Sequence, residues 1–145
     1  MTNGLRISLF LIIVTTCSPV AFAQDSYEKA PTSYSQAAET MTAMVKQIHE
    51  LYAGKPAFLT KFDASQKAWE EYRRLHIEAL YPGGRSSYGS SYNNCAPLES
   101  LRLAKERINI INQWITGTIE GDVCGGTVRW VTEEEYVRAT GQTLE

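Results

Sequence analysis

The chain has 145 residues, of which 43% are hydrophobic and 21% are charged, and its formal net charge at pH 7 is −2. This length and composition predict one soluble globular domain and leave no room for a second. The acidic balance argues against a nucleic-acid-binding protein, which would carry a basic stripe, and is compatible with a cationic protein partner.

The N-terminus has the three parts of a secretory signal peptide over residues 1–23. Arg6 supplies the positive charge, the run SLFLIIVTTC is apolar, and Ala21-Phe22-Ala23 is a small-x-small cleavage site. The apolar run is short for a membrane span, and the segment after it is polar. We therefore predict cleavage after Ala23, no stable membrane span in the mature chain, and a periplasmic or secreted location. Because Arg6 is the only charged residue removed, the mature chain has a net charge of −3.

A lipoprotein anchored at Cys17 is the competing interpretation of this segment. The residue before a lipidated cysteine is usually Gly, Ala or Ser, and here it is Thr16. The sequence therefore favours cleavage at Ala23 over lipidation at Cys17.

After a loose polar leader over residues 24–32, a single domain is expected over 33–145. A first helix, capped by Thr32 or Ser33, is predicted up to Ala53-Gly54. A second helix is predicted from Pro56 to Leu80, since proline suits a first turn and Pro82 follows the end. Its apolar residues recur at helical spacing, which predicts a core centred on Trp69 and Tyr72.

Residues 82–96 are rich in Gly, Ser, Tyr and Asn and are expected to form a long loop. A third helix is predicted from Pro97 to Gly117, followed by a short extended piece near 127–131. Thr132 and Glu135 form a capping box for a last short helix ending near Thr140. The predicted fold is all-α: a small bundle of three main helices and a short C-terminal helix.

Cleavage would leave Cys95 and Cys124 as the two thiols of the mature chain. Two cysteines in an exported protein predict one disulfide, which would tether the 82–96 loop to the segment after the third helix. The alternative is two free thiols.

The sequence contains no recognisable catalytic or metal-binding set, so we predict no enzyme activity, no metal and no cofactor. His49-Glu50 begins like a zinc-protease HExxH motif, but residue 53 is alanine, so the second ligand is missing. His76 is interpreted as a packed or surface histidine. Glu70 and Glu71 are adjacent, and their side chains point in different directions on a helix.

Five residues of the second helix fit the pattern Q-x-A-W-x-x-Y-R: Gln66, Ala68, Trp69, Tyr72 and Arg73. The pattern continues through YPGGRSSYGSSYNNC at 81–95 and Trp114…Gly117…EGDVCGG. Over about residues 41–126 the chain resembles the lysozyme inhibitor LprI family of small secreted bacterial proteins. The resemblance implies an exported protein that inhibits lysozyme.

The resemblance to this family implies a cysteine shortly after the Tyr-Arg pair. None follows Arg73 closely here, which makes the chain a divergent member. Gln66, Trp69, Tyr72 and Arg73 are interpreted as a structural motif. Arg73 is expected to pair with Glu99, with Glu106 or with a loop carbonyl.

The 82–94 loop is the best candidate for binding a partner, because Tyr, Ser, Gly and Asn are the residues that binding loops use. The candidate partner-binding residues are Arg85, Ser86, Ser87, Tyr88 and Tyr92. A lysozyme-type cleft holds two carboxylates, which a projecting cation could occupy. The partner would be a lysozyme-like muramidase or another cell-wall hydrolase. The alternatives are a plain surface loop and a structural or small-ligand-binding envelope protein that inhibits nothing.

Overall fold

The structure is a computed structural model that describes residues 31–142, and it confirms the predicted fold class. It contains three long helices, α2 (Tyr34–Leu51), α3 (Pro56–Leu80) and α4 (Gly84–Thr116), and a short helix, α5 (Glu133–Thr140). Two strands of two residues each, β1 (Thr118–Ile119) and β2 (Trp130–Val131), pair in parallel before α5. The predicted signal peptide and most of the leader lie outside the described residues.

Helix ends follow the local signals in the sequence. The Ser33 hydroxyl accepts a hydrogen bond from the Gln36 amide at the start of α2, and Pro56 is the first residue of α3. Thr132 and Glu135 form the predicted capping box of α5. None of the helices within residues 31–142 is long and apolar enough to cross a membrane.

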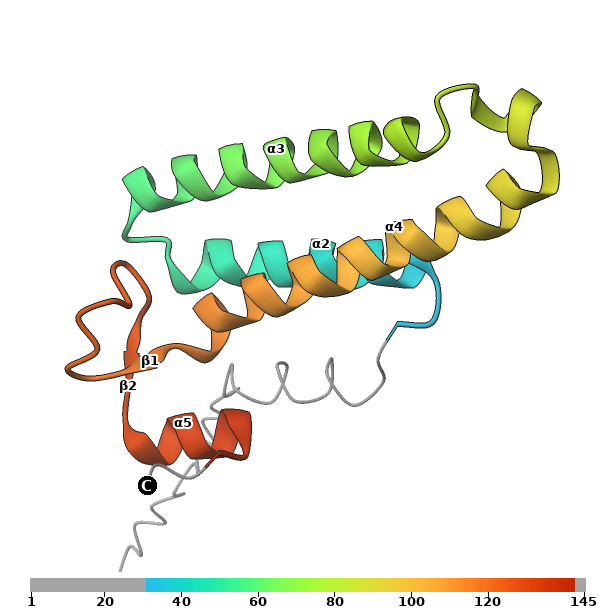
Figure 1. Cartoon of the computed structure of the whole chain (residues 1–145). Helices are drawn as coiled ribbons and strands as arrows, with labels where there is room; N and C mark the ends of the chain where they lie inside the picture. The colour runs from blue at the N-terminus through green and yellow to red at the C-terminus, as the bar shows by residue number, and fades with distance from the viewer. Residues whose placement is uncertain (1–30, 143–145) are drawn as a thin grey trace, which may run out of the picture.

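The three long helices form two successive antiparallel hairpins (Figure 1). The turn between α2 and α3 is short, and α4 runs antiparallel to α3 and parallel to α2. Since α3 has 25 residues and α2 has 18, the α3–α4 hairpin continues past the N-terminal end of α2. We call this extension, residues 74–100, the arm, and its end, residues 81–93, the tip.

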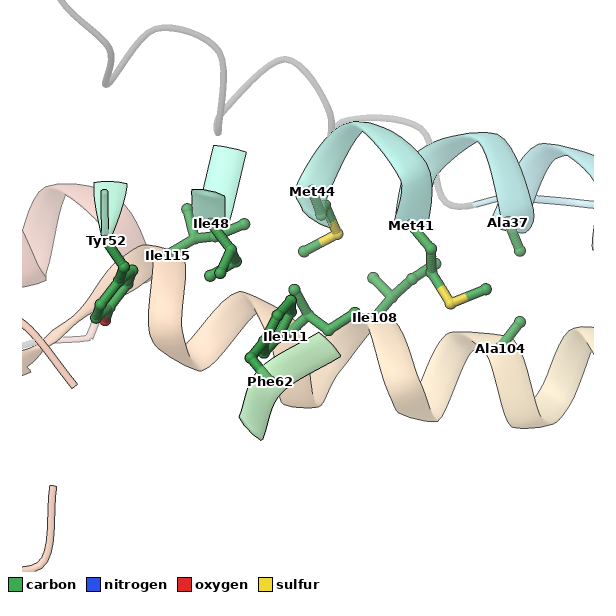
Figure 2. Close-up of a cluster of buried hydrophobic side chains, with 10 residues drawn as sticks. All are labelled: Ala37, Met41, Met44, Ile48, Tyr52, Phe62, Ala104, Ile108, Ile111 and Ile115. Carbon is green, nitrogen blue, oxygen red and sulfur yellow. The ribbon is translucent and has the colours of Figure 1, made fainter. Parts of the chain in front are cut away.

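The core lies mainly between α2 and α4, where two stripes at helical spacing face each other (Figure 2). The α2 stripe is Ala37, Met41, Met44 and Ile48, and the α4 stripe is Ala104, Ile108, Ile111 and Ile115. Small and slender side chains let these two helices pack closely. Phe62 of α3 and Tyr52 complete the buried cluster.

The predicted core centre at Trp69 and Tyr72 is therefore wrong. Trp69 is partly buried at the edge of the cluster, and Tyr72 is 53% exposed. On α3, the polar Gln66 faces α4 and the polar Arg73 faces α2, whereas the α2 stripe contains no polar residue. The larger apolar burial is available between α2 and α4, and the core forms there.

The predicted 82–96 loop is also wrong, because α4 begins at Gly84 and includes this segment. The helix is broken at Gly89, whose φ of 52° and ψ of −120° are not helical. Beyond this break, Tyr92 and Ala96 are four residues apart, a helical spacing that the neighbouring polar residues obscure. Ser, Asn and Tyr disfavour a helix only mildly, so packing of that face decides the outcome.

The predicted Cys95–Cys124 disulfide is not formed, and both cysteines are free and exposed. Cys124 lies in the loop beside Trp114 near the end of α4. Cys95 precedes Trp114 by 19 residues of helix, which is about 28 Å at 1.5 Å per residue. A disulfide needs the two Cα atoms within about 7 Å, so the extension of α4 through Cys95 separates the thiols.

The C-terminal segment is attached to the bundle through Tyr52. Its phenol donates a hydrogen bond to the Trp114 carbonyl (2.9 Å) and accepts one from the Arg129 amide (3.0 Å). Burial raises the pKa of Tyr52. Arg129 also donates from Nε to the Ile115 carbonyl at the end of α4. Gly117, at a φ of 90°, allows this approach, because a Cβ there would lie 2.8 Å from the Arg129 carbonyl oxygen.

Candidate functional site: the tip of the arm

The tip is held together by three tyrosines. The Tyr81 ring lies edge-on to the rings of Tyr88 and Tyr92, and both centroid separations are 5.3 Å. Such edge-to-face contacts fix the relative positions of the end of α3 and the first turns of α4. Partial burial raises the pKa of the Tyr81 phenol, and the neighbouring Cys95 raises it further.

Of the five residues predicted to bind a partner, four are exposed at the tip. These are Arg85, Ser86, Ser87 and Tyr88, whereas Tyr92 is half-buried and packs against Tyr81. All five residues lie in the first turns of α4, at the end of the arm.

Arg85 is oriented by Asn93, which lies eight residues further along α4 and beyond the break at Gly89. Its Nε donates to the Asn93 side-chain oxygen at 2.6 Å. Its two terminal nitrogens have no hydrogen-bond partner within residues 31–142. A guanidinium fixed through Nε presents its two outer nitrogens as a fork, which is the geometry that binds a carboxylate.

The backbone of the tip is set by closely spaced glycines. The Ser86 hydroxyl donates to the Gly83 carbonyl at 3.1 Å. A Cβ at Gly83 would lie 2.3 Å from the Ser87 hydroxyl oxygen, so only glycine fits beneath this serine. Gly84 follows with a φ of 63° and turns the chain into α4.

A charged cluster joins the two helices at the base of the tip. His76 of α3 lies 2.8 Å from the Glu99 carboxylate of α4, and Arg102 donates to both oxygens of that carboxylate at 2.7 and 2.9 Å. The hydrogen bonds from Arg102 first, and from His76 second, lower the pKa of Glu99 to about 2. Glu99 is therefore ionised over the physiological pH range and fixes the spacing of the arm.

The structural motif has different partners from those predicted. Glu99 and Glu106 are both paired with Arg102, and the Arg73 guanidinium lies over the Tyr34 ring, 4.4 Å from its centroid. The Arg73 Nε is buried without a hydrogen-bond partner in the part of the chain that the structure describes. The prediction that Arg73 pairs with one of these carboxylates is wrong.

Gln66 is matched instead to Arg107, a residue that the sequence analysis missed. The Arg107 side chain is 8% exposed, and it donates to the Gln66 side-chain oxygen at 2.5 Å and to the Ser65 hydroxyl at 2.8 Å. Burial lowers its pKa. Its place between Ala104 and Ile111 on the apolar face of α4 is the signal that could have identified it.

The described residues offer no metal site. No group of three or more His, Cys, Asp or Glu side chains is close enough to hold an ion within residues 31–142. His49 of the HExx sequence lies 2.8 Å from Asp63 of α3, in an exposed contact between the first two long helices. This histidine has a structural partner.

A comparison with protein families gives a match that covers more than half of the chain. The family model described as lysozyme inhibitor LprI matches residues 15–110, which include the Q-x-A-W-x-x-Y-R motif and the tip. The phrase at 114–126, which also resembles the family, lies beyond the matched range. No curated protein and no solved structure matches the chain. The match over residues 15–110 establishes that the chain belongs to the lysozyme inhibitor LprI family.

Proposed function

We propose that the protein is an exported inhibitor of a lysozyme-like muramidase, and that the tip of the arm enters the cleft of the enzyme. Membership of the lysozyme inhibitor LprI family supports the target class. The signal-peptide pattern over residues 1–23 supports a periplasmic or secreted location. The protein acts by binding and carries out no reaction of its own.

The observation that carries the proposed mechanism is the geometry of Arg85. The arm extends beyond α2, so the tip can approach a concave surface without a clash from the rest of the bundle (Figure 1). Arg85 offers there two guanidinium nitrogens that have no partner among residues 31–142, beside the exposed ring of Tyr88. A muramidase cleft contains a pair of carboxylates, and a guanidinium can bind one of them through two parallel hydrogen bonds.

Tyr88 supplies the apolar part of the contact. Its ring is 39% exposed and is held from behind by Tyr81. A tyrosine loses little side-chain entropy on binding, and a packed tyrosine loses less, so this residue is suited to be an anchor. Ser86 and Ser87 lie beside it and can hydrogen-bond to the walls of a cleft.

The test is the turnover of peptidoglycan by c-type lysozyme at increasing concentrations of the mature protein, residues 24–145. We expect inhibition by the unaltered protein and a loss of at least tenfold in inhibitory potency for Arg85→Ala, since a charge-assisted bidentate contact contributes about 1.5–3 kcal/mol. Tyr88→Ala should weaken inhibition by a similar factor.

Matched controls are available on other faces. Arg138→Ala removes an exposed arginine from α5, and Trp130→Ala removes an exposed aromatic side chain from β2, away from the tip. Both variants should inhibit as the unaltered protein does. Equal loss in the controls would show that the tip is not the contact. No inhibition at micromolar protein would remove c-type lysozyme as the target and favour the alternative, a structural or ligand-binding envelope protein.

A further inference from the structure

A second surface feature lies at the end of the bundle opposite the tip. A hollow of about 690 Å³ opens between the first turns of α3, the last turn of α4 and the loop that follows it. Pockets that bind small molecules have volumes of about 300–1,000 Å³. The hollow is therefore large enough for an organic molecule of two or three rings.

The inner wall of the hollow is aromatic. Phe58, Phe62 and Trp114 form one cluster, in which the Trp114 ring lies 6.1 Å from Phe58 and 5.9 Å from Phe62, centroid to centroid. Tyr136 of α5 contributes a fourth ring to the lining. Flat apolar walls of this kind favour a ligand with an aromatic or aliphatic body.

The outer wall is a loop whose shape is fixed by its own hydrogen bonds. The Asp122 carboxylate accepts from the Thr118 hydroxyl (2.8 Å) and, on its other oxygen, from the Cys124 amide (2.9 Å). The hydrogen bond from Thr118 first, and that from Cys124 second, lower the pKa of Asp122. Lys55 ties the loop to the start of α3 by donating to the Thr127 carbonyl. The hollow is thus preformed. Asp122 keeps its negative charge, and both of its carboxylate oxygens are hydrogen-bonded within its own loop.

Lys61 is the charged group in the lining that remains available. It projects from α3, it is exposed, and no carboxylate within residues 31–142 lies within ion-pair distance of it. The nearest acidic residue along its helix, Asp63, is paired with His49. The aromatic inner wall can take the apolar body of a ligand, and Lys61 can take one negative group; Asp122, on the outer wall, is hydrogen-bonded within its own loop.

We propose that this hollow is a binding site for a small amphipathic anion, with its apolar body against the aromatic cluster and its acidic group at Lys61. Much of the hollow is built from residues after 110, where the family match ends, and it lies far from the tip. The site is therefore a second function, and it is independent of muramidase inhibition.

Two fluorescent probes that differ in one group test the proposal on the mature protein. 8-Anilinonaphthalene-1-sulfonate has the aromatic body and a negative group, and N-phenyl-1-naphthylamine has the same rings without the sulfonate. We expect saturable binding of the sulfonate with one molecule per chain. Lys61→Gln should lower the affinity for the sulfonate by about tenfold, which is the scale of a charge-assisted contact. The affinity for the neutral probe should not change.

Lys67→Gln, an exposed lysine of α3 outside the lining, is the matched control and should bind both probes as the unaltered protein does. Far-ultraviolet circular dichroism verifies that each variant keeps its helices. Binding of the sulfonate that does not saturate, or an equal effect of the two lysine substitutions, would overturn the proposal.

The alkylation rates of the two free cysteines show where the probe binds. Cys124 lines the hollow, and Cys95 lies in the arm, about 28 Å of helix away from Trp114. Saturating sulfonate should slow the alkylation of Cys124 by iodoacetamide severalfold and leave Cys95 unaffected, as measured by peptide mass mapping. Equal rates at Cys124 with and without the probe would place the probe elsewhere and contradict the proposal.

Discussion

Glu99 is the residue on which the geometry of the arm depends most. Its carboxylate accepts from His76 on α3 and from Arg102 on its own helix, so one anion joins the two sides of the hairpin. Its side chain is 23% exposed, and solvent therefore screens the interaction in part. The free energy that it contributes is modest, but it acts where few other contacts hold α3 to α4.

The lowered pKa of Glu99 predicts a defined pH dependence. The folded-state pKa is about 2 and the ordinary value is 4.5, so the carboxylate stabilises the fold at neutral pH. This contribution is lost as the pH falls from about 5 toward about 2. We expect Glu99→Gln to lower the free energy of urea unfolding by about 1 kcal/mol at neutral pH, and the difference from the unaltered protein to shrink below about pH 3.

Glu39→Gln is the control for this measurement, because Glu39 is exposed on α2 and has no ion-pair partner among residues 31–142. Its unfolding free energy should match that of the unaltered protein at every pH. A Glu99→Gln effect that is the same at acidic and neutral pH would contradict the assigned pKa.

For single residues, the sequence predicted that a polar side chain on a packed helix face needs a hydrogen-bond partner, but it did not predict which residue the partner is. Gln66 lies on the buried side of α3 and had to be matched, but its partner, Arg107, comes from a helix 41 residues later. Arg73 was expected to meet a carboxylate and instead covers the Tyr34 ring. Which polar group reaches which depends on the rotation of α3 and α4 about their axes, and residue spacing within one helix does not determine it.

Helix boundaries were predictable because they depend on neighbouring residues. Ser33, Pro56 and the Thr132–Glu135 capping box act within one turn of the chain, and each lies where the sequence places it. Residues 82–96 were mistaken for a loop because their glycines and serines have weak local preferences. The contacts of Tyr88 and Tyr92 with Tyr81 are tertiary, and they stabilise the helical conformation that the local preferences favour only weakly.

Gly89 gives this element its bend, which predicts the effect of one substitution. Its φ of 52° with a ψ of −120° is a conformation that residues with a Cβ avoid, at a cost of about 1–3 kcal/mol. We expect Gly89→Ala to speed hydrogen exchange of the amides in residues 84–93 by about tenfold or more, and to leave the second half of α4 unchanged. Exchange with mass-spectrometric readout measures both regions in one experiment.

Gly54→Ala is the matched substitution. Gly54 is not among the glycines with positive φ, and a Cβ there would meet nothing within 4 Å. Its exchange pattern should equal that of the unaltered protein. Unchanged exchange at the tip in the Gly89→Ala variant would show that the bend can be relieved without cost.

For the whole molecule, the sequence predicted the number of helices but not which pair forms the core. All three long helices carry an apolar face, and choosing among the pairings requires comparing how much surface each would bury. The pairing of α2 with α4 leaves Tyr72 and Leu75 of α3 exposed, at 53% and 48%. The position of the tip was likewise hidden, because it follows from the different lengths of α2 and α3.

The separation of the thiols predicts a bundle whose stability needs no disulfide. Under non-reducing conditions, alkylation and peptide mapping should find Cys95 and Cys124 both modified. The double variant Cys95→Ser, Cys124→Ser should have an unfolding free energy within about 0.5 kcal/mol of the unaltered protein, because both side chains are exposed. A chain two mass units lighter that resists alkylation would contradict this separation.

The length of the arm can also be changed without changing the residues at its tip. Seven residues make nearly two turns of helix, about 10 Å long, so removing seven from α3 and seven from the facing part of α4 would retract the tip and keep its faces aligned. This one deletion would remove residues 74–80 and 94–100, leave Arg85 and Tyr88 at the tip, and bring them about 10 Å closer to the bundle. Under the proposed function, the nearly two helical turns beyond α2 would set how deep a cleft the tip can enter.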